Sequence, residues 1–311
     1  MHRHDSIPAS SNCLIGSKGG FTLIELSIVL VIIGLIIGAI LVGQDMIAAA
    51  TVRMQIAQIE KYQSAVNTFK SKFNNQLPGD ISNADAVAFG FSARGAYAGE
   101  GDGNGIIEGV TTNLAGHNYG IALAAGETAM FWVDLAQAQL IDISLSTASP
   151  SVVPGATVTG SAVALYMPPA KIGGGNYVFV WSGGSSPKLG TAQGLGSVNY
   201  YGISAQYTIN TSVGLGSNAT IPVQQAYAMD SKVDDGFPTS GTVVAGTPNG
   251  GFNCLWAIPA FPQGCNIPVI SLAGSSTTCF DNNGNNTNTA TYSTKWNSGS
   301  NPNCTLSFKF Q

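Results

Sequence analysis

The chain has 311 residues, of which 44% are apolar and only 9% are charged, and its formal net charge is −4. So little charge excludes the basic surface of a nucleic-acid-binding protein, and the chain has no acidic tail. The apolar content is enough to build a core, so disorder is not expected. The chain is rich in glycine, with 39 residues, and such a composition is associated with β-rich surface proteins that have many loops.

The first predicted element is an apolar helix. Residues 26–44 contain no charged side chain, and as a helix these 19 residues reach about 30 Å, the thickness of a bilayer core. Arg3 and Lys18 precede the run, so the positive-inside rule places the N-terminus in the cytoplasm and the rest of the chain outside. A cleaved secretory signal peptide is the competing interpretation, but its apolar core would be shorter, about 7–15 residues. An uncleaved signal anchor explains all of this except Glu25, because an acid is costly in a membrane helix.

The residues around Glu25 form a specific pattern. The segment "KGGFTLIEL" joins a glycine pair, a phenylalanine, an acid and a long apolar run in that order. It resembles the processing site of type IV prepilins and type II secretion pseudopilins. The resemblance implies that prepilin peptidase cuts between Gly20 and Phe21 and that Phe21 is then N-methylated. It also implies that the Glu25 carboxylate pairs with the amine of a neighbouring subunit during assembly, because two paired charges can be buried where one alone cannot.

The helical pattern continues beyond the apolar run. Charged residues fall mostly off an apolar stripe with spacings of three or four, which predicts an amphipathic helix docked on a domain. Pro78 and Gly79 are expected to end this helix. Gly34 and Gly38 form a G-x-x-x-G pair, which indicates either close helix packing or simple tolerance of glycine. The stripe consists of Val52, Ile56, Ile59, Tyr62, Val66, Phe69 and Phe73.

These elements predict an α+β fold. A single helix from residue 21 to about residue 73 would pack its second half on a C-terminal antiparallel β-sheet domain, the ladle shape that the resemblance to pilins implies. The predicted divisions are a cytoplasmic leader at 1–20, a transmembrane half at 21–45, an amphipathic half at 46–77 and a globular domain at 78–311.

A glycine-rich loop after the helix suggests a metal site. The segment "AGEGDGNGIIEGV" carries oxygen-bearing side chains at alternating positions, which partly matches a calcium-binding loop. Thr111 stands where such a loop has its closing bidentate glutamate, so a hydrophilic turn is the alternative. Calcium is the one cofactor that the sequence suggests, and the candidate ligands are Glu100, Asp102, Asn104 and Glu108.

The rest of the chain reads as a mixture of helices and strands. Ser82 and Asp85 resemble a capping box for a short helix, and a buried helix is predicted over about 127–140. Strand-like runs follow at "AVALYMP", "NYVFVWSG" and "NYYGISAQYTI", and "CTLSFKF" is expected to be the closing strand. Another helix is predicted between Pro222 and Gly236. Its three aspartates at 230, 234 and 235 are interpreted as a solvated helix end rather than a metal site.

The cysteines indicate disulfides. If Cys13 leaves with the leader, Cys254, Cys265, Cys279 and Cys304 remain outside the membrane, and an even set there favours two bonds. Three pairings are possible, and the short turn-rich loops favour Cys254 with Cys265 and Cys279 with Cys304. The second loop resembles the disulfide-bounded C-terminal loop of many pilins. Zinc is disfavoured because C-x-x-C pairs are absent.

No catalytic pattern is present in the sequence. After processing, His117 would be the one remaining histidine, and no nucleophile, zinc or phosphate-loop motif occurs. We therefore expect a structural subunit and not an enzyme, with a membrane-tethered hydrolase as the weakest alternative.

The resemblance implies a subunit of a type IV pilus or a type II secretion pseudopilus, and the length of the chain favours a minor subunit. The resemblance also implies a single-pass protein of the bacterial inner membrane with its C-terminal domain in the periplasm. Its partners would be other pilin or pseudopilin subunits, prepilin peptidase and an inner-membrane assembly platform, with no nucleic acid. The main alternative is an uncleaved signal-anchored binding protein or adhesin that does not polymerise.

Overall fold

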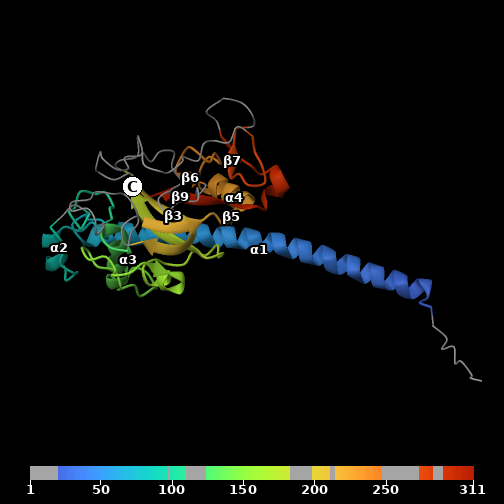
Figure 1. The fold of residues 1–311 in the computed structure, drawn as a ribbon, viewed down its shortest axis with the longest axis horizontal. Helices are drawn as coiled ribbons and strands as arrows, with labels where there is room; N and C mark the ends of the chain where they lie inside the picture. The colour runs from blue at the N-terminus through green and yellow to red at the C-terminus, as the bar shows by residue number, and fades with distance from the viewer. Residues whose placement is uncertain are drawn as a thin grey trace, which may run out of the picture. The chain divides into compact units, whose positions relative to one another are not determined.

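In a computed structural model of the protein, the described residues are 20–96, 99–109, 124–182, 198–210, 214–246, 273–282 and 290–311. The chain divides into two units, Met1–Ile47 and Ala48–Gln311, which are described separately. The helix α1 (Leu23–Lys72) contributes residues to both units (Figure 1).

The described part of the first unit is the apolar half of α1. Its large apolar side chains, from Leu23 to Ile47, are all exposed. By length and composition this helix is able to cross a membrane, and none of its most apolar window is buried. Residues 26–44 contain no proline, so no residue of this run interrupts the backbone hydrogen bonds of the helix.

In the second unit, α1 buries one stripe of side chains. Val52, Ile59, Tyr62 and Phe69 are buried at the helical spacing that the sequence predicts. Gln58 is also buried, and its side-chain amide donates to the carbonyl oxygen of Pro169 at 2.9 Å, while its Oε1 accepts from the backbone of Lys171 at 2.9 Å. The stripe therefore combines apolar packing with fixed polar contacts.

The helix α1 ends close to the predicted residue 73, but the residues that end it are not Pro78 and Gly79. The helix ends at Lys72, and Asn74 and Asn75 adopt left-handed conformations with φ of 49° and 60°. The backbone N–H of Asn75 donates to the carbonyl oxygen of Lys70 at 2.9 Å. Asparagine tolerates this conformation and closes helices in this way, so the stop signal is the asparagine pair.

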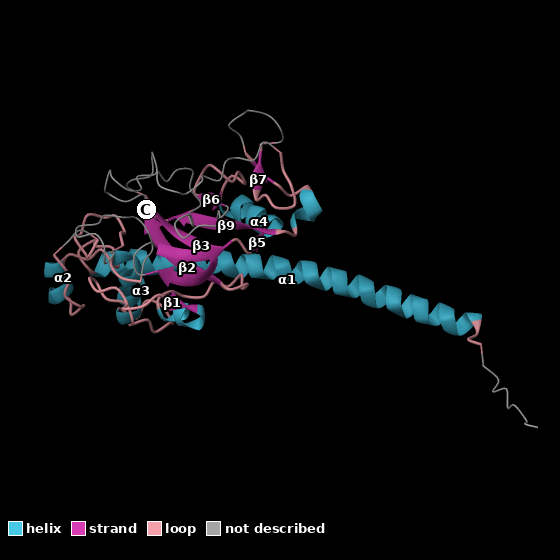
Figure 2. Cartoon of the chain, in the orientation of Figure 1, coloured by secondary structure: helices cyan, strands magenta, loops and turns pink. Residues whose placement is uncertain are grey.

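An antiparallel sheet forms the centre of the second unit (Figure 2). Residues 200–203 of β3 (Asn199–Asn210) pair with both β2 (Asn176–Ser182) and β9 (Pro302–Lys309), so those two strands lie on opposite sides of β3. β6 (Val243–Gly246) pairs with the outer side of β9. The short strands β1 (Val158–Thr159), β4 (Gly214–Asn218) and β5 (Ile221–Pro222) extend this sheet, whereas β7 (Phe280–Asp281) and β8 (Thr291–Tyr292) form a separate pair.

Aromatic side chains join α1 and α3 (Glu127–Gln137) to the sheet. Tyr62 of α1 packs edge-to-face on Trp132 of α3, with ring centroids 4.9 Å apart. Both rings approach Tyr201 of β3, at 6.2 and 6.4 Å, and Tyr201 stacks on Phe310 at 4.3 Å. Rings of this size bury large apolar areas, so this cluster is the main packing contact between helices and sheet.

The remaining helices confirm two predictions and correct one. α2 (Asn83–Ala88) is capped by Ser82, and α4 (Val223–Val233) begins directly after Pro222, as predicted. The run "AVALYMP" is not a strand, because residues Gly160–Leu165 form the 3-10 helix η1. The run ends in Pro168 and is followed by Pro169, and these prolines remove two donors that a central strand would need.

Candidate functional site

The start of α1 holds the residues of the predicted processing site. Gly20 and Phe21 lie just before the helix, and the Phe21 side chain is 86% exposed. Thr22 caps the helix: its backbone N–H and its hydroxyl both donate to Glu25 Oε2 at 2.8 Å. In return, the backbone N–H of Glu25 donates to the Thr22 hydroxyl oxygen at 3.3 Å. Thr22 and Glu25 are therefore a reciprocal capping box.

The capping box leaves part of the Glu25 carboxylate available. Both Thr22 donors go to Oε2, and no residue in the described part of the chain donates to Oε1. A carboxylate has about four lone-pair sites, so Glu25 is able to cap its own helix and to accept from another molecule at once. Glu25 was expected to act in assembly, but its capping role was not predicted, although T-x-x-E at a helix start is a recognisable signal.

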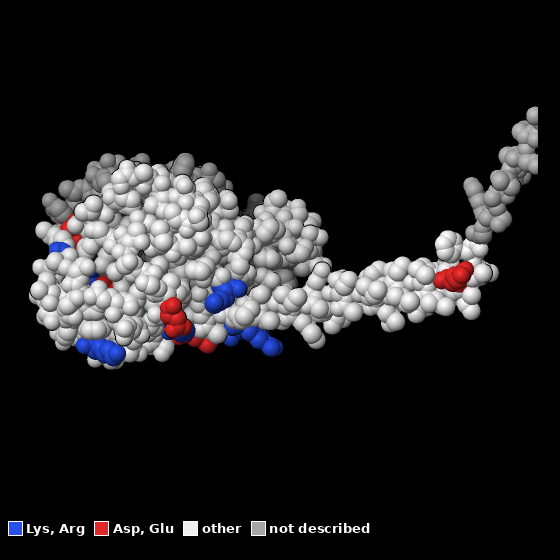
Figure 3. Space-filling view, turned by 90° about the horizontal axis from the view of Figure 1, so that it is seen from below, with Lys and Arg blue, Asp and Glu red and all other residues white. Residues whose placement is uncertain are grey.

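The surface around this acid is apolar. Leu23, Ile24 and Leu26 are each more than half exposed. Figure 3 shows this stretch of helix as almost uniformly uncharged. An added Cβ at Gly34 or Gly38 would meet no atom within 4 Å, so these glycines lie at open positions of the helix surface. The segment thus offers a long apolar helix face with one acid at its start.

A second candidate site is the glycine-rich loop at 99–109. Its backbone is held by two buried acids, Asp80 and Glu127. The Asp80 carboxylate accepts from the backbone of Gly103 at 2.8 Å and of Gly105 at 2.6 Å. Glu127 accepts from the backbone of Gly101 at 3.0 Å and of residue 108 at 2.8 Å. The loop is therefore folded around carboxylates that belong to its neighbours.

Burial changes the protonation of these acids. Loss of hydration, with a smaller contribution from nearby Asp102, raises the pKa of Asp80 to about 7, against the effect of its backbone hydrogen bonds. Burial also raises the pKa of Glu127 well above its usual value, and the charges of Asp80, Glu108 and Asp102 act in the same direction. Carboxylates that repel one another in a buried site favour either a shared proton or a bound cation.

The predicted calcium ligands differ in their burial. Glu100 and Glu108 are buried, whereas Asp102 and Asn104 are exposed and hydrogen-bonded to each other at 3.0 Å. At this loop, the carboxylates that come within 4.8 Å of one another are those of Asp80, Asp102 and Glu127, so Asp102 is the one predicted ligand in that group. Oxygen donors of this kind suit calcium. Calcium binding at this loop stays a prediction.

Asp80 and Glu127 were missed as members of this cluster. Asp80 stands in the turn after α1, and Glu127 was interpreted as an acid of a helix first turn. The two acids come close together because α3 begins beside the loop, with Glu127 as its first residue. Nothing in the sequence around either acid indicates that the two are close in the fold.

A buried ion pair lies near this loop. Arg94 Nη2 donates to Asp134 Oδ2 at 2.6 Å, and neither side chain is exposed. The same oxygen accepts from the backbone of Gly79 at 2.7 Å. Burial raises the pKa of Asp134 despite the opposing charge of Arg94. The ion pair joins the segment after α2 to α3, and the Gly79 contact joins α3 to the segment after α1.

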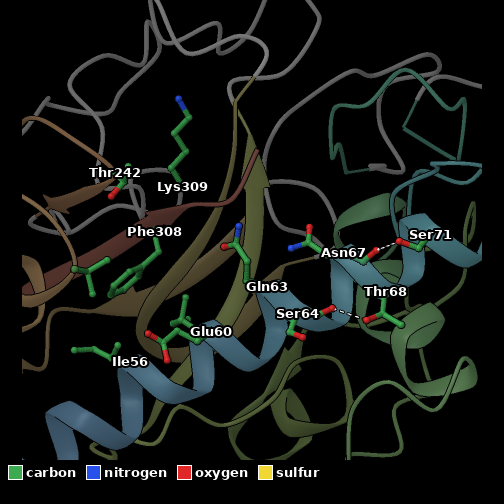
Figure 4. Close-up of a pocket in the computed structure, with 12 residues that line it drawn as sticks. Ile56, Glu60, Gln63, Ser64, Asn67, Thr68, Ser71, Thr242, Phe308 and Lys309 are labelled. Atoms are coloured by element: carbon green, nitrogen blue, oxygen red, sulfur yellow. Dashed lines mark hydrogen bonds between the residues drawn. The ribbon is translucent and has the colours of Figure 1, made fainter.

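The second unit also has a groove between α1 and β9 (Figure 4). Its volume is about 600 Å³. Ile56 and Ile59 form an apolar end, and polar side chains of α1 form a wall opposite Phe308 and Lys309. The described lining contains no histidine or cysteine, so it offers no Ser–His or Cys–His pair.

The C-terminal region contains a disulfide between Cys279 and Cys304, with Cα atoms 5.0 Å apart. Both cysteines are fully buried, and the bond ties the start of β7 to β9. Cys254, Cys265 and His117 lie outside the described residues. The aspartates at 230, 234 and 235 do come together, but each one accepts hydrogen bonds from neighbouring groups of the chain.

Comparison with known proteins gives one match. Residues 16–41 match the family described as the prokaryotic N-terminal methylation motif. No curated protein and no solved structure matches the chain. The matched segment contains Gly20, Phe21, Thr22 and Glu25, the residues whose geometry is given above.

Proposed function

We propose that this chain, which carries the methylation motif that is the hallmark of type IV prepilins and pseudopilins, is a structural subunit of a type IV pilus or a type II secretion pseudopilus. In this proposal prepilin peptidase cleaves between Gly20 and Phe21, and Phe21 is N-methylated. The carrying observation is that the motif at 16–41 coincides with an exposed apolar helix that begins at Leu23. Proteins marked by this motif are structural, and we propose that this one is not an enzyme.

The same proposal assigns a location and partners. The apolar half of α1 anchors the precursor in the inner membrane as a single span, with the second unit in the periplasm. Its partners are prepilin peptidase, the inner-membrane assembly platform and other pilin or pseudopilin subunits. The length of the mature chain supports a minor subunit rather than the main component of the filament.

Assembly depends on Glu25 in this proposal. Cleavage creates a new cationic amine at Phe21, and a neighbouring subunit can offer this amine to Glu25 Oε1 while Oε2 remains in the capping box with Thr22. An apolar environment makes an unpaired charge costly, so helices are held at the register in which amine and carboxylate meet. The exposed apolar side chains around Glu25 support burial of this contact between helices.

Two substitutions separate the charge pair from the helix cap. Glu25→Gln keeps a side-chain oxygen for the Thr22 donors but removes the charge, whereas Thr22→Val removes the cap hydroxyl and keeps the charge. We expect both variants to be cleaved after Gly20. We expect Glu25→Gln to lose most of its incorporation into filaments and Thr22→Val to retain it.

The measurement is the amount of each variant in sheared filament fractions, relative to its amount in membranes, in a strain that has the assembly machinery. Equal incorporation of Glu25→Gln and the unaltered chain would contradict the charge pair. If Thr22→Val lost incorporation into filaments while Glu25→Gln retained it, Glu25 would act in helix capping and not in the charge pair. A chain that retains Met1 and never enters filaments would favour the uncleaved binding protein or adhesin.

A further inference from the structure

Three exposed aromatic side chains surround one pocket in the C-terminal part of the second unit. Tyr227 of α4, Phe237 of the following loop and Trp296 of the 3-10 turn η2 (Trp296–Gly299) are 41%, 42% and 46% exposed. All three line the same pocket, whose volume is about 370 Å³. Single exposed aromatic residues are common on proteins, but a cluster around a hollow marks a binding surface.

One wall of this pocket is held by a chain of contacts. The Tyr227 ring packs edge-to-face on Tyr292, with centroids 5.8 Å apart. The Tyr292 hydroxyl donates to Asp230 at 2.7 Å, and the backbone N–H of Gly236 donates to the other oxygen of Asp230 at 3.0 Å. An added Cβ at Gly236 would lie 3.4 Å from the Tyr227 ring, so the backbone also packs against that ring. Tyr227 is therefore exposed and yet fixed in place.

The opposite wall is held as firmly. A Cβ at Gly274 would overlap Trp296 Nε1 and Asp281 Oδ2, so glycine is required for the backbone to lie against the edge of the indole. The disulfide between Cys279 and Cys304 anchors this wall to the main sheet. α4 contacts both β8 and η2, which brings the two walls together. The region lies around the labels α4 and β7 in Figure 1.

Polar groups lie between the aromatic rings. Asp235 lines the pocket, and its two oxygens accept from the backbone of Phe237 at 2.8 Å and from the Ser240 hydroxyl at 2.7 Å. A carboxylate with one bond to each oxygen retains lone pairs for a ligand hydroxyl. Lys295 and Thr294 also line the pocket and add donors.

This combination selects a class of ligand. A sugar ring has faces of C–H groups that stack on aromatic rings and an edge of hydroxyl groups that bind carboxylates, hydroxyls and ammonium groups. An organic cation would also favour aromatic rings and carboxylates, and Asp281 lines the pocket beside Asp235, so a cation is the alternative ligand that the test must separate from a sugar. Ligand pockets have volumes of about 300–1,000 Å³, so this one suits one or two sugar rings.

We propose that the pocket between α4, β8 and η2 is a carbohydrate-binding site, in which Trp296 and Tyr227 stack on a neutral pyranose and Asp235 accepts hydrogen bonds from its hydroxyl groups. The site is built from residues of the second unit alone. It goes beyond the structural role at the N-terminus and does not depend on it, because the described residues that line the pocket lie far from that segment in the sequence.

The test is binding of the full-length chain to an array of immobilised neutral oligosaccharides of hexoses and N-acetylhexosamines. The protein is kept in a detergent without a sugar headgroup, so that the detergent does not compete. Trp296→Ala is compared with Tyr207→Ala, which removes an equally exposed ring of β3 that does not line the pocket. The disulfide and the thermal unfolding of each variant are checked first.

We expect saturable binding to at least one oligosaccharide. Trp296→Ala should weaken it by about tenfold or more, and Tyr207→Ala should change it by less than about twofold. Trp296→Phe should recover part of the affinity, because it restores a ring. Failure of every saccharide, or equal binding by Trp296→Ala, would overturn the proposal.

Saturable binding of tetramethylammonium without any saccharide would also overturn the proposal and would assign the pocket to cations. The result of this binding test is independent of whether the chain is a filament subunit. A chain that binds saccharide but keeps Met1 would contradict only the proposed function, and a processed chain that binds none would contradict only this inference.

Discussion

The disulfide between Cys279 and Cys304 should carry a measurable part of the stability of the second unit. It joins residues 25 apart in the sequence, and the chain-entropy estimate for a loop of that length is about 3.5 kcal/mol at 25 °C. Both cysteines are fully buried, so replacement by alanine also removes packed sulfur atoms. We expect the double variant Cys279→Ala/Cys304→Ala to lose about 3.5 kcal/mol or somewhat more, which corresponds to about 7–14 °C in Tm for a unit of this size.

The assay is urea unfolding of the full chain in detergent, followed by near-ultraviolet circular dichroism, with the two single variants as matched controls. Either single substitution already breaks the bond, so each should show nearly the whole loss, and the two should not add in the double variant. A loss of less than about 1 kcal/mol, or singles that sum to the double, would refute the argument from loop closure.

Three further predictions concern the buried charges and the acidic loop of the second unit. Arg94→Met leaves the Asp134 carboxylate buried without its cation, and we expect a loss of about 3–5 kcal/mol in urea unfolding at pH 8. The loss should become smaller as the pH is lowered, because burial raises the pKa of Asp134 and protonation removes the unpaired charge. A loss that does not change with pH would contradict this. The raised pKa of Asp80, about 7, means that the folded state holds a proton that the unfolded state releases. This contribution to the free energy of unfolding is therefore fully present below about pH 4 and is lost as the pH rises to about 7. Asp80→Asn should make the slope of stability against pH less steep in that window when measured with a calcium chelator, and an unchanged slope would refute the assignment. Millimolar calcium should raise the Tm of the unaltered chain at pH 8 if the loop at 99–109 binds the ion, and no shift would contradict calcium binding.

Elements that rest on local periodicity were predictable from the sequence. The apolar run and the stripe that includes Tyr62 and Phe69 indicated one long helix, and α1 is continuous over Leu23–Lys72. The apolar, strand-like run "NYVFVWSG" and the alternation in "CTLSFKF" indicated β2 and β9. The end of α1 at Lys72 agrees with the expected end at about residue 73, but the asparagine pair at 74 and 75, a weaker signal than Pro78, is what ends the helix. η1 was misjudged because a short apolar run carries no period of its own.

Sites that depend on tertiary contacts were harder to predict from the sequence. Gly20, Phe21 and Glu25 are recognisable because they are neighbours in sequence. Asp80 meets Glu127 across 47 residues, and Tyr227 meets Trp296 across 69, so neither the buried acids nor the aromatic pocket has a local signature. The capping box of Thr22 and Glu25 is local, and T-x-x-E directly before an apolar run is a signal for it in the sequence.

The central claim is that this chain is a processed pilin-like subunit. The most direct measurement is mass spectrometry of the N-terminal peptide of the chain, isolated from membranes of cells that contain prepilin peptidase. We expect a peptide that begins at Phe21, lacks residues 1–20 and carries one additional methyl group on its amine. A peptide that begins at Met1 in cells whose other prepilins are cleaved would contradict the account.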